Sequence, residues 1–93
     1  MALDIVVRPS DGGEFTVEVA DGAAVTRVSV VASERFLTGL DAPDAPAEEV
    51  VREAVALLLD ERPPGQLADQ IDLDEVAAED EEFVPELQSR LGF

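Results

Sequence analysis

The densest group of side chains with chemical potential in this sequence is a run of carboxylates in its last third. Residues 69 to 82 contain eight acids and no basic residue. Carboxylates at this density bind a cation, act as an acid–base pair, or present a surface to a basic partner. A solvated acidic face that keeps the protein soluble is the alternative. The eight acids, which form our candidate docking surface, are Asp69, Asp72, Asp74, Glu75, Glu79, Asp80, Glu81 and Glu82.

The spacing of these acids does not match a calcium-binding loop. Counted from Asp72, the sixth position is Ala77, where such a loop requires glycine, and the twelfth is Phe83, where it requires glutamate. A pair of catalytic carboxylates needs a concave site that separates their pKa values, and a chain of 93 residues has little room for one. We therefore predict no metal ion, no cofactor and no catalytic residue.

The composition lacks the residue types on which most catalytic and metal sites depend. The chain has no cysteine and no histidine, which removes thiolate nucleophiles, disulfides, common zinc ligands and the usual general base. Its six basic residues face 22 acids, so the net charge is -16. Phosphate binding requires clustered basic side chains instead. We predict that the protein is not an enzyme and does not bind nucleic acid directly.

The sequence offers no candidate for a membrane segment. Its longest apolar run, residues 54 to 59, has six residues, whereas a spanning helix needs about 20. The first residues do not combine a basic start, an apolar stretch and a small-residue cleavage site. We expect a cytoplasmic protein without membrane contact.

Residues 1 to 32 follow a strand pattern. Apolar and polar side chains alternate over residues 3 to 8 and 14 to 19, and residues 25 to 31 are rich in β-branched side chains. The segments 9 to 13 and 21 to 22 contain the glycines and aspartates of tight reversals. This pattern predicts a three-stranded antiparallel meander.

Residues 33 to 93 read as mainly helical. Ser33 is placed to cap a short helical turn, and Gly39 occupies the position of a left-handed C′ glycine that would end it. The strongest helix pattern runs from Pro46 to Arg62, where apolar residues recur at steps of three and four before Pro63-Pro64-Gly65. One or two short helices are predicted around residues 67 to 76, with Asp72 as a cap, and another at 85 to 91.

These elements predict a single α+β domain over residues 1 to 93, with the meander packed by one long helix and followed by short C-terminal helices. The charge is unevenly divided between its two parts. Residues 1 to 40 hold six acids and three arginines, whereas residues 41 to 93 hold sixteen acids and three arginines. The acidity therefore belongs to the helical part.

Five segments of the chain resemble a group of small uncharacterised bacterial proteins. They are Phe36-Leu37-Thr38-Gly39, Pro46-Ala47-Glu48-Glu49-Val50-Val51-Arg52, Leu57-Leu58-Leu59, Ile71-Asp72-Leu73 and Pro85-Glu86-Leu87. The resemblance covers roughly residues 15 to 91 and implies a short β-meander with a helix. It departs from the group at Ile71, where the group has an aromatic residue. It departs again at Phe83-Val84, where the group has tyrosine and phenylalanine before the proline. The group has no assigned activity to transfer.

The predicted order of elements is also similar to small winged-helix domains that recognise leader peptides in peptide-modifying pathways. Both have three strands followed by three helices, here ending in Leu91-Gly92-Phe93. The resemblance implies that a peptide adds as a strand to an exposed sheet edge. Such an edge serves equally for a homodimer.

From these observations we expect a small acidic, non-enzymatic protein-interaction domain whose partner is another protein. One alternative is an acidic inhibitor, an antitoxin-like protein or a nucleic-acid mimic, which would bind a basic partner. A second alternative is a peptide-recognition module that uses a sheet edge.

Overall fold

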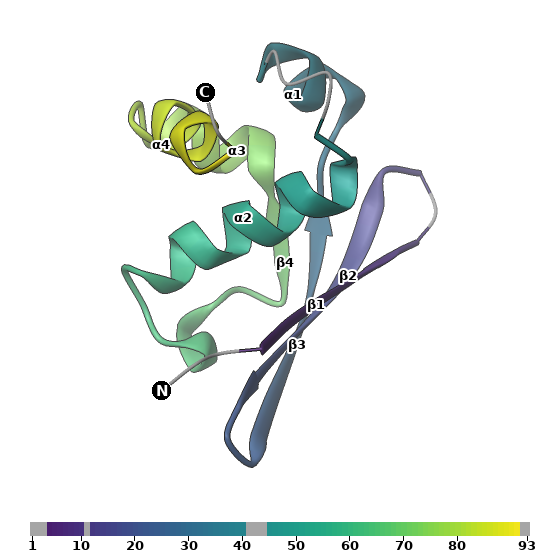
Figure 1. Cartoon of the computed structure of the whole chain (residues 1–93), viewed down its shortest axis with the longest axis vertical. Coiled ribbons are helices and arrows are strands. Elements are labelled where there is room, and N and C mark those ends of the chain that lie inside the picture. The colour runs from purple at the N-terminus through teal and green to yellow at the C-terminus, as the bar shows by residue number, and fades with distance from the viewer. Residues whose placement is uncertain (1–3, 11, 41–44, 92–93) are drawn as a thin grey trace.

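The computed structural model of the chain describes residues 4–10, 12–40 and 45–91 (Figure 1). Its elements are β1 (Asp4–Pro9), β2 (Glu14–Asp21), β3 (Ala24–Val31), α1 (Glu34–Gly39), α2 (Ala47–Leu59), the 3-10 turn η1 (Pro64–Gln66), β4 (Gln70–Asp72), α3 (Leu73–Glu79) and α4 (Phe83–Arg90). This is the predicted α+β fold class. Leu3 of the first predicted strand, Asp11 of the first predicted turn, residues 41–44 and the final Gly92-Phe93 lie outside the described residues.

Strands β1, β2 and β3 form the predicted antiparallel meander. In its register Val7 lies opposite Val17, which lies opposite Val28 on the next strand. The backbone reverses direction at Gly13, with φ of 80°, and at Gly22, with φ of 64°, values that glycine adopts without steric cost. A Cβ atom at Gly13 would lie 3.3 Å from the backbone oxygen of Ala32, so a side chain here would also crowd that oxygen.

The sheet has a fourth strand that the sequence analysis did not predict. Residues 70–72, assigned above to short helices, instead form β4 and pair in parallel with β3, so that Ile71 lies opposite Val30. Three residues are too few for an alternation to be recognised, and the partner strand is distant in the sequence. The strand order is β1-β2-β3-β4, which makes β1 and β4 the two edges. β4 also interrupts the helical part of the chain.

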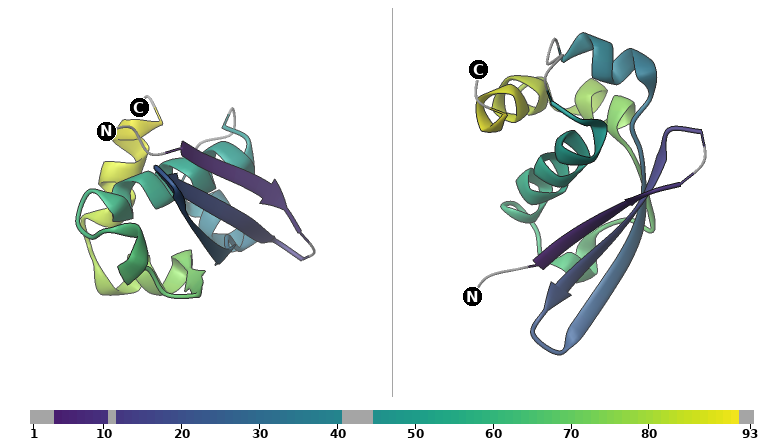
Figure 2. Two further views of the ribbon diagram at one scale, coloured as in Figure 1. Left: turned by 90° about the horizontal axis from the view of Figure 1, so that it is seen from below. Right: turned by 45° about the vertical axis from the view of Figure 1, so that its right-hand side comes forward.

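One face of the sheet is covered by helices, and the other carries none among the described residues (Figure 2). Helix α2 contacts β1 and β2, and its Val51, Ala54 and Val55 are fully buried. The sheet residues of this core are Phe15, Val17, Val19, Val28, Val30 and Ile71. No polar or charged side chain of the described part is buried. The charges therefore lie at the surface, as the cost of burying an unpaired charge requires.

The helices predicted at residues 46 to 62 and 85 to 91 are correct in position but differ from the structure at their ends. Helix α2 ends at Leu59 rather than at the predicted Arg62. The chain leaves it through a tighter turn in which Glu61 N–H donates to Leu58 O, and Pro63 disfavours the helical conformation at Arg62. Helix α4 begins at Phe83, two residues before the predicted Pro85. Its first residue packs against α1, with the rings of Phe36 and Phe83 centred 6.5 Å apart.

Both predicted helix caps are confirmed. The Ser33 hydroxyl accepts the Phe36 N–H at the start of α1, and Asp72 Oδ1 accepts the Asp74 N–H at the start of α3. Gly39 was wrongly predicted as the left-handed residue that ends α1. It is the last helical residue, and the C-cap is the buried Leu40 with φ of -71°. Leu40 closes the helix by donating its N–H to Phe36 O and carries the chain into the core.

The fourth strand is tested by hydrogen exchange at β3. Ala32 N–H donates to Gly13 O, so even-numbered residues of β3 bond to β2 and odd-numbered residues face the other side. There the Ser29 N–H donates to Asp69 O at 2.9 Å, whereas Arg27 lies beyond the start of β4. We expect amide exchange to be slow at Ser29 and fast at Arg27, measured by NMR in deuterated buffer. Equally fast exchange at both amides would show that β4 is not paired.

Candidate functional site

The structure divides the eight acids of the candidate docking surface into two groups. Three of them use a carboxylate oxygen within the fold. Asp72 caps α3, Asp74 accepts the hydroxyl proton of Ser33, and Asp80 Oδ1 accepts the Glu82 N–H. The Ser33–Asp74 hydrogen bond joins the start of α1 to α3 and is half-buried. These three carboxylates therefore stabilise the fold.

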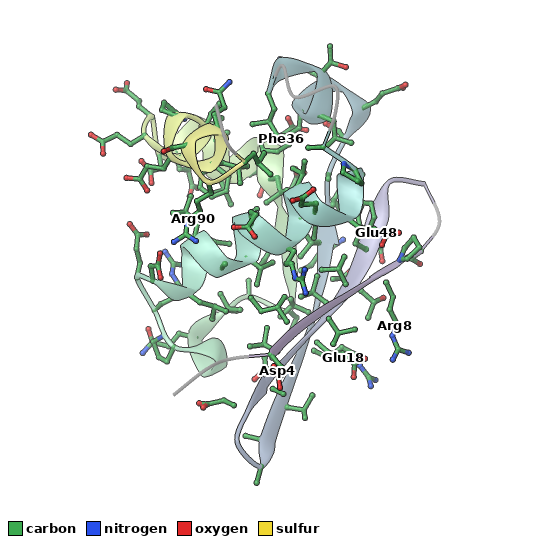
Figure 3. The ribbon with its side chains drawn as sticks, in the orientation of Figure 1. Asp4, Arg8, Glu18, Phe36, Glu48 and Arg90 are labelled. Carbon is green, nitrogen blue, oxygen red and sulfur yellow. The ribbon has the colours of Figure 1, made fainter. Side chains whose placement is uncertain are left out.

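The other five acids have exposed side chains, and four of them lie close together in the chain. Glu75 and Glu79 are one turn apart on α3 and so lie on one face of it, and Glu81 and Glu82 follow in the turn before α4. We call these four residues the acidic corner. Oxygen-tipped side chains gather around α3 and α4 in Figure 3. Asp69 stands apart, at the far end of β4 from α3.

A small hollow of about 160 Å³ adjoins the acidic corner beside β4. Its apolar residues are Leu58, Leu67, Ala68, Ile71 and Val76, and its polar residues are Arg62, Gln70, Asp72, Glu75 and Glu79. Within the described residues, no group of three acids is arranged to hold a metal ion. The hollow therefore brings one arginine to acids of α3 without forming a coordination site.

A larger hollow region, which the sequence analysis did not identify, lies between β1 and α2. It consists of two adjoining hollows of about 460 and 430 Å³ that share Ile5, Val6 and Arg52. We call this region the β1 groove. The residues that line it are Asp4, Ile5, Val6, Val7, Pro46, Glu48, Glu49, Arg52, Glu53 and Ala56.

One wall of the β1 groove is the edge of the sheet, beside which no further strand lies among residues 4–10, 12–40 and 45–91. Ser10 N–H donates to Glu14 O, which makes the even-numbered residues of β1 those that bond to β2. The N–H and C=O groups of Ile5 and Val7 therefore point away from the sheet. Their side chains are half-buried against the core. The alternation of residues 3 to 8 signals an amphipathic strand, but the groove depends on α2 crossing β1, which no local pattern reveals.

The rim of the β1 groove is acidic. Four of the residues that line the groove are acids, namely Asp4, Glu48, Glu49 and Glu53, and one, Arg52, is basic. Figure 3 shows Asp4 at the start of β1 and Glu48 near the start of α2. Glu48 and Glu49 lie in the first turn of α2, where the helix dipole stabilises negative charge. The groove therefore combines outward-facing backbone groups of β1 with an acidic rim.

No protein family, curated protein or solved structure matches the chain. None of the helices in the described part is both long and apolar enough to cross a membrane.

The structural role of Asp74 is tested by a double-mutant cycle. We expect Asp74→Ala to lower the free energy of unfolding by about 1–3 kcal/mol, because it leaves the half-buried Ser33 hydroxyl without its acceptor. Ser33→Ala removes the same hydrogen bond and the helix cap in addition. Because the two substitutions share one hydrogen bond, their effects on the free energy of unfolding should not add, with a coupling of about 1 kcal/mol. Urea denaturation measures both.

Glu81→Ala is the control for this cycle, since it removes an exposed acid of the acidic corner and should change stability by less than about 0.5 kcal/mol. Equal effects of Asp74→Ala and Glu81→Ala would contradict the division of the acids into two groups.

Proposed function

We propose that the protein is a non-enzymatic protein-interaction domain that binds a basic protein through its acidic surface. The observation that carries this proposal is where the charges lie. The ion pairs of the described residues join Arg8, Arg27 and Arg90 to Glu18, Glu53 and Asp60. Each of these acids lies outside the segment of residues 69 to 82. The acidic corner therefore presents carboxylates that the fold does not use.

The overall charge favours such a partner. A net charge of -16 on 93 residues, held outside an apolar core, produces a negative potential that extends beyond the surface. This potential accelerates the approach of a basic protein and repels acidic competitors. Once the surfaces meet, the release of counterions and the contacts between carboxylates and basic side chains contribute to binding. The rate of approach and the affinity both decrease as added salt shortens the range of the potential.

An acidic inhibitor, an antitoxin-like protein and a nucleic-acid mimic are three forms of this proposal, since each acts by covering a basic target. They differ in the target and share the acidic surface. A peptide-recognition module is a second candidate function, and the open edge of β1 at the β1 groove favours it.

The proposal is tested by capturing proteins from a cell lysate on the immobilised wild-type chain and on two immobilised variants of equal net charge. The corner variant carries Glu75→Gln, Glu79→Gln, Glu81→Gln and Glu82→Gln. The control variant carries Asp21→Asn, Glu34→Gln, Glu61→Gln and Asp69→Asn, which are exposed acids outside the acidic corner. Each variant removes the same number of charges, so a difference between them reports position rather than total charge.

We expect to capture a basic protein on the wild-type chain and on the control variant. The corner variant should bind the same protein roughly ten-fold less tightly. Raising the salt from about 0.05 M to about 0.3 M shortens the screening length from roughly 14 Å to roughly 6 Å and should release it. Quantitative mass spectrometry of the eluates, followed by titration calorimetry with the purified partner, provides the measurement. Equal losses in both variants, or a partner insensitive to salt, would contradict docking at the acidic corner.

A further inference from the structure

We propose that the β1 groove binds an extended basic segment of a partner protein, which adds to the sheet as an antiparallel strand beside β1. The inference rests on the proposed function in one respect, that the partner is basic. The place and the mode of binding are independent of the acidic corner.

The open edge of β1 supplies the backbone contacts. On this side Ile5 and Val7 present their N–H and C=O groups, and a residue opposite each of them in an antiparallel strand exchanges both hydrogen bonds with it. Val7 is the last donor on this side within β1, because Pro9, the next outward-facing residue, has no N–H. The edge therefore accepts a short strand in a defined position, as in other cases of strand addition.

The walls of the groove determine the side chains of that strand. Residues opposite Ile5 and Val7 share their face of the sheet and therefore point toward α2, where Glu48, Glu49 and Arg52 line the groove. Long basic side chains fit here, since their aliphatic stems cover apolar surface while their charged ends reach the rim.

The residue opposite Val6 points to the outer face of the sheet instead. Val6 is 45% exposed there, so an apolar side chain beside it buries both. The groove therefore selects a segment in which basic and apolar residues alternate, with the basic ones facing α2.

A second copy of the chain is the other occupant to consider. Two β1 strands that pair antiparallel around Val6 would place Asp4 of each copy opposite Arg8 of the other, a favourable contact. Each copy nevertheless carries a net charge of -16, and the repulsion between them opposes this pairing. Salt distinguishes the two occupants, because screening weakens the binding of a basic segment and strengthens self-association.

The probe is the capped pentapeptide Lys-Val-Lys-Val-Lys, titrated into the isotope-labelled full chain at low salt and followed by amide chemical shifts. Two N-methylated derivatives of this peptide test the mode of binding. One is N-methylated at its lysines, and the other at its valines. With lysines opposite Ile5 and Val7, the lysine amides are those that donate to β1. We expect lysine methylation to weaken binding at least ten-fold and valine methylation to weaken it less than three-fold.

The site is tested with a matched pair of variants. Glu48→Gln with Glu49→Gln removes acids from the rim of the groove, and Glu81→Gln with Glu82→Gln removes the same charge from the acidic corner. We expect the first pair to weaken the peptide roughly three- to ten-fold and the second less than two-fold, since exposed ion pairs contribute modestly and locally. The capped peptide Glu-Val-Glu-Val-Glu should not bind.

Three results would overturn the inference, and they differ in what they leave standing. Strand addition at β1 is wrong if valine methylation weakens binding more than lysine methylation, or if the peptide shifts only the amide signals of α3 and α4. The proposal that the partner is basic would still stand. If the peptide does not bind at low salt and the chain remains a monomer, strand addition at β1 is wrong, while the capture experiment at the acidic corner still decides the proposed function. If the peptide does not bind and sedimentation shows a dimer that strengthens with salt and loosens in Val6→Asp, the occupant of the edge is a second copy.

Discussion

The packing of α2 across one face of the sheet is the interaction on which the other features of this protein depend. Val51, Ala54 and Val55 of the helix and Val17 and Val19 of β2 are fully buried, and each such aliphatic side chain contributes about 1.5–3 kcal/mol of transfer free energy. Because this interface takes up apolar side chains alone, the charges of the described residues remain at the surface. Because α2 also crosses β1, the same interface creates the β1 groove.

The run of acids in residues 69 to 82 is not one surface. Asp72 and Asp74 occupy positions where a carboxylate stabilises the start of a helix, and the Ser33–Asp74 hydrogen bond connects two helices that are distant in the sequence. Glu81 and Glu82, only a few residues later, project from a turn. Composition therefore overstates the number of free carboxylates, and hydrogen-bonding geometry leaves the acidic corner as the candidate docking surface.

Local patterns predicted the parts of the fold that depend on local forces. Strict alternation located β2, and side-chain capping located the starts of α1 at Ser33 and of α3 at Asp72. The pairing of β4 with β3 was not predictable, since Ile71 becomes a strand residue only because Val30 lies beside it. The candidate site shows the same limit. The acids were identified from their types, whereas the groove between Ile5 and Arg52 exists only after α2 has packed on β1.

The central claim is that a basic segment joins the sheet at β1, and proton distances between the two chains test it most directly. In an antiparallel pair, the α-protons of residues opposite each other in a non-hydrogen-bonded position lie very close together. On the outer side of β1, Val6 occupies that position. The account predicts a strong nuclear Overhauser effect between the Val6 α-proton and an α-proton of the bound segment. Intermolecular effects confined to protons of α3 and α4 would contradict it.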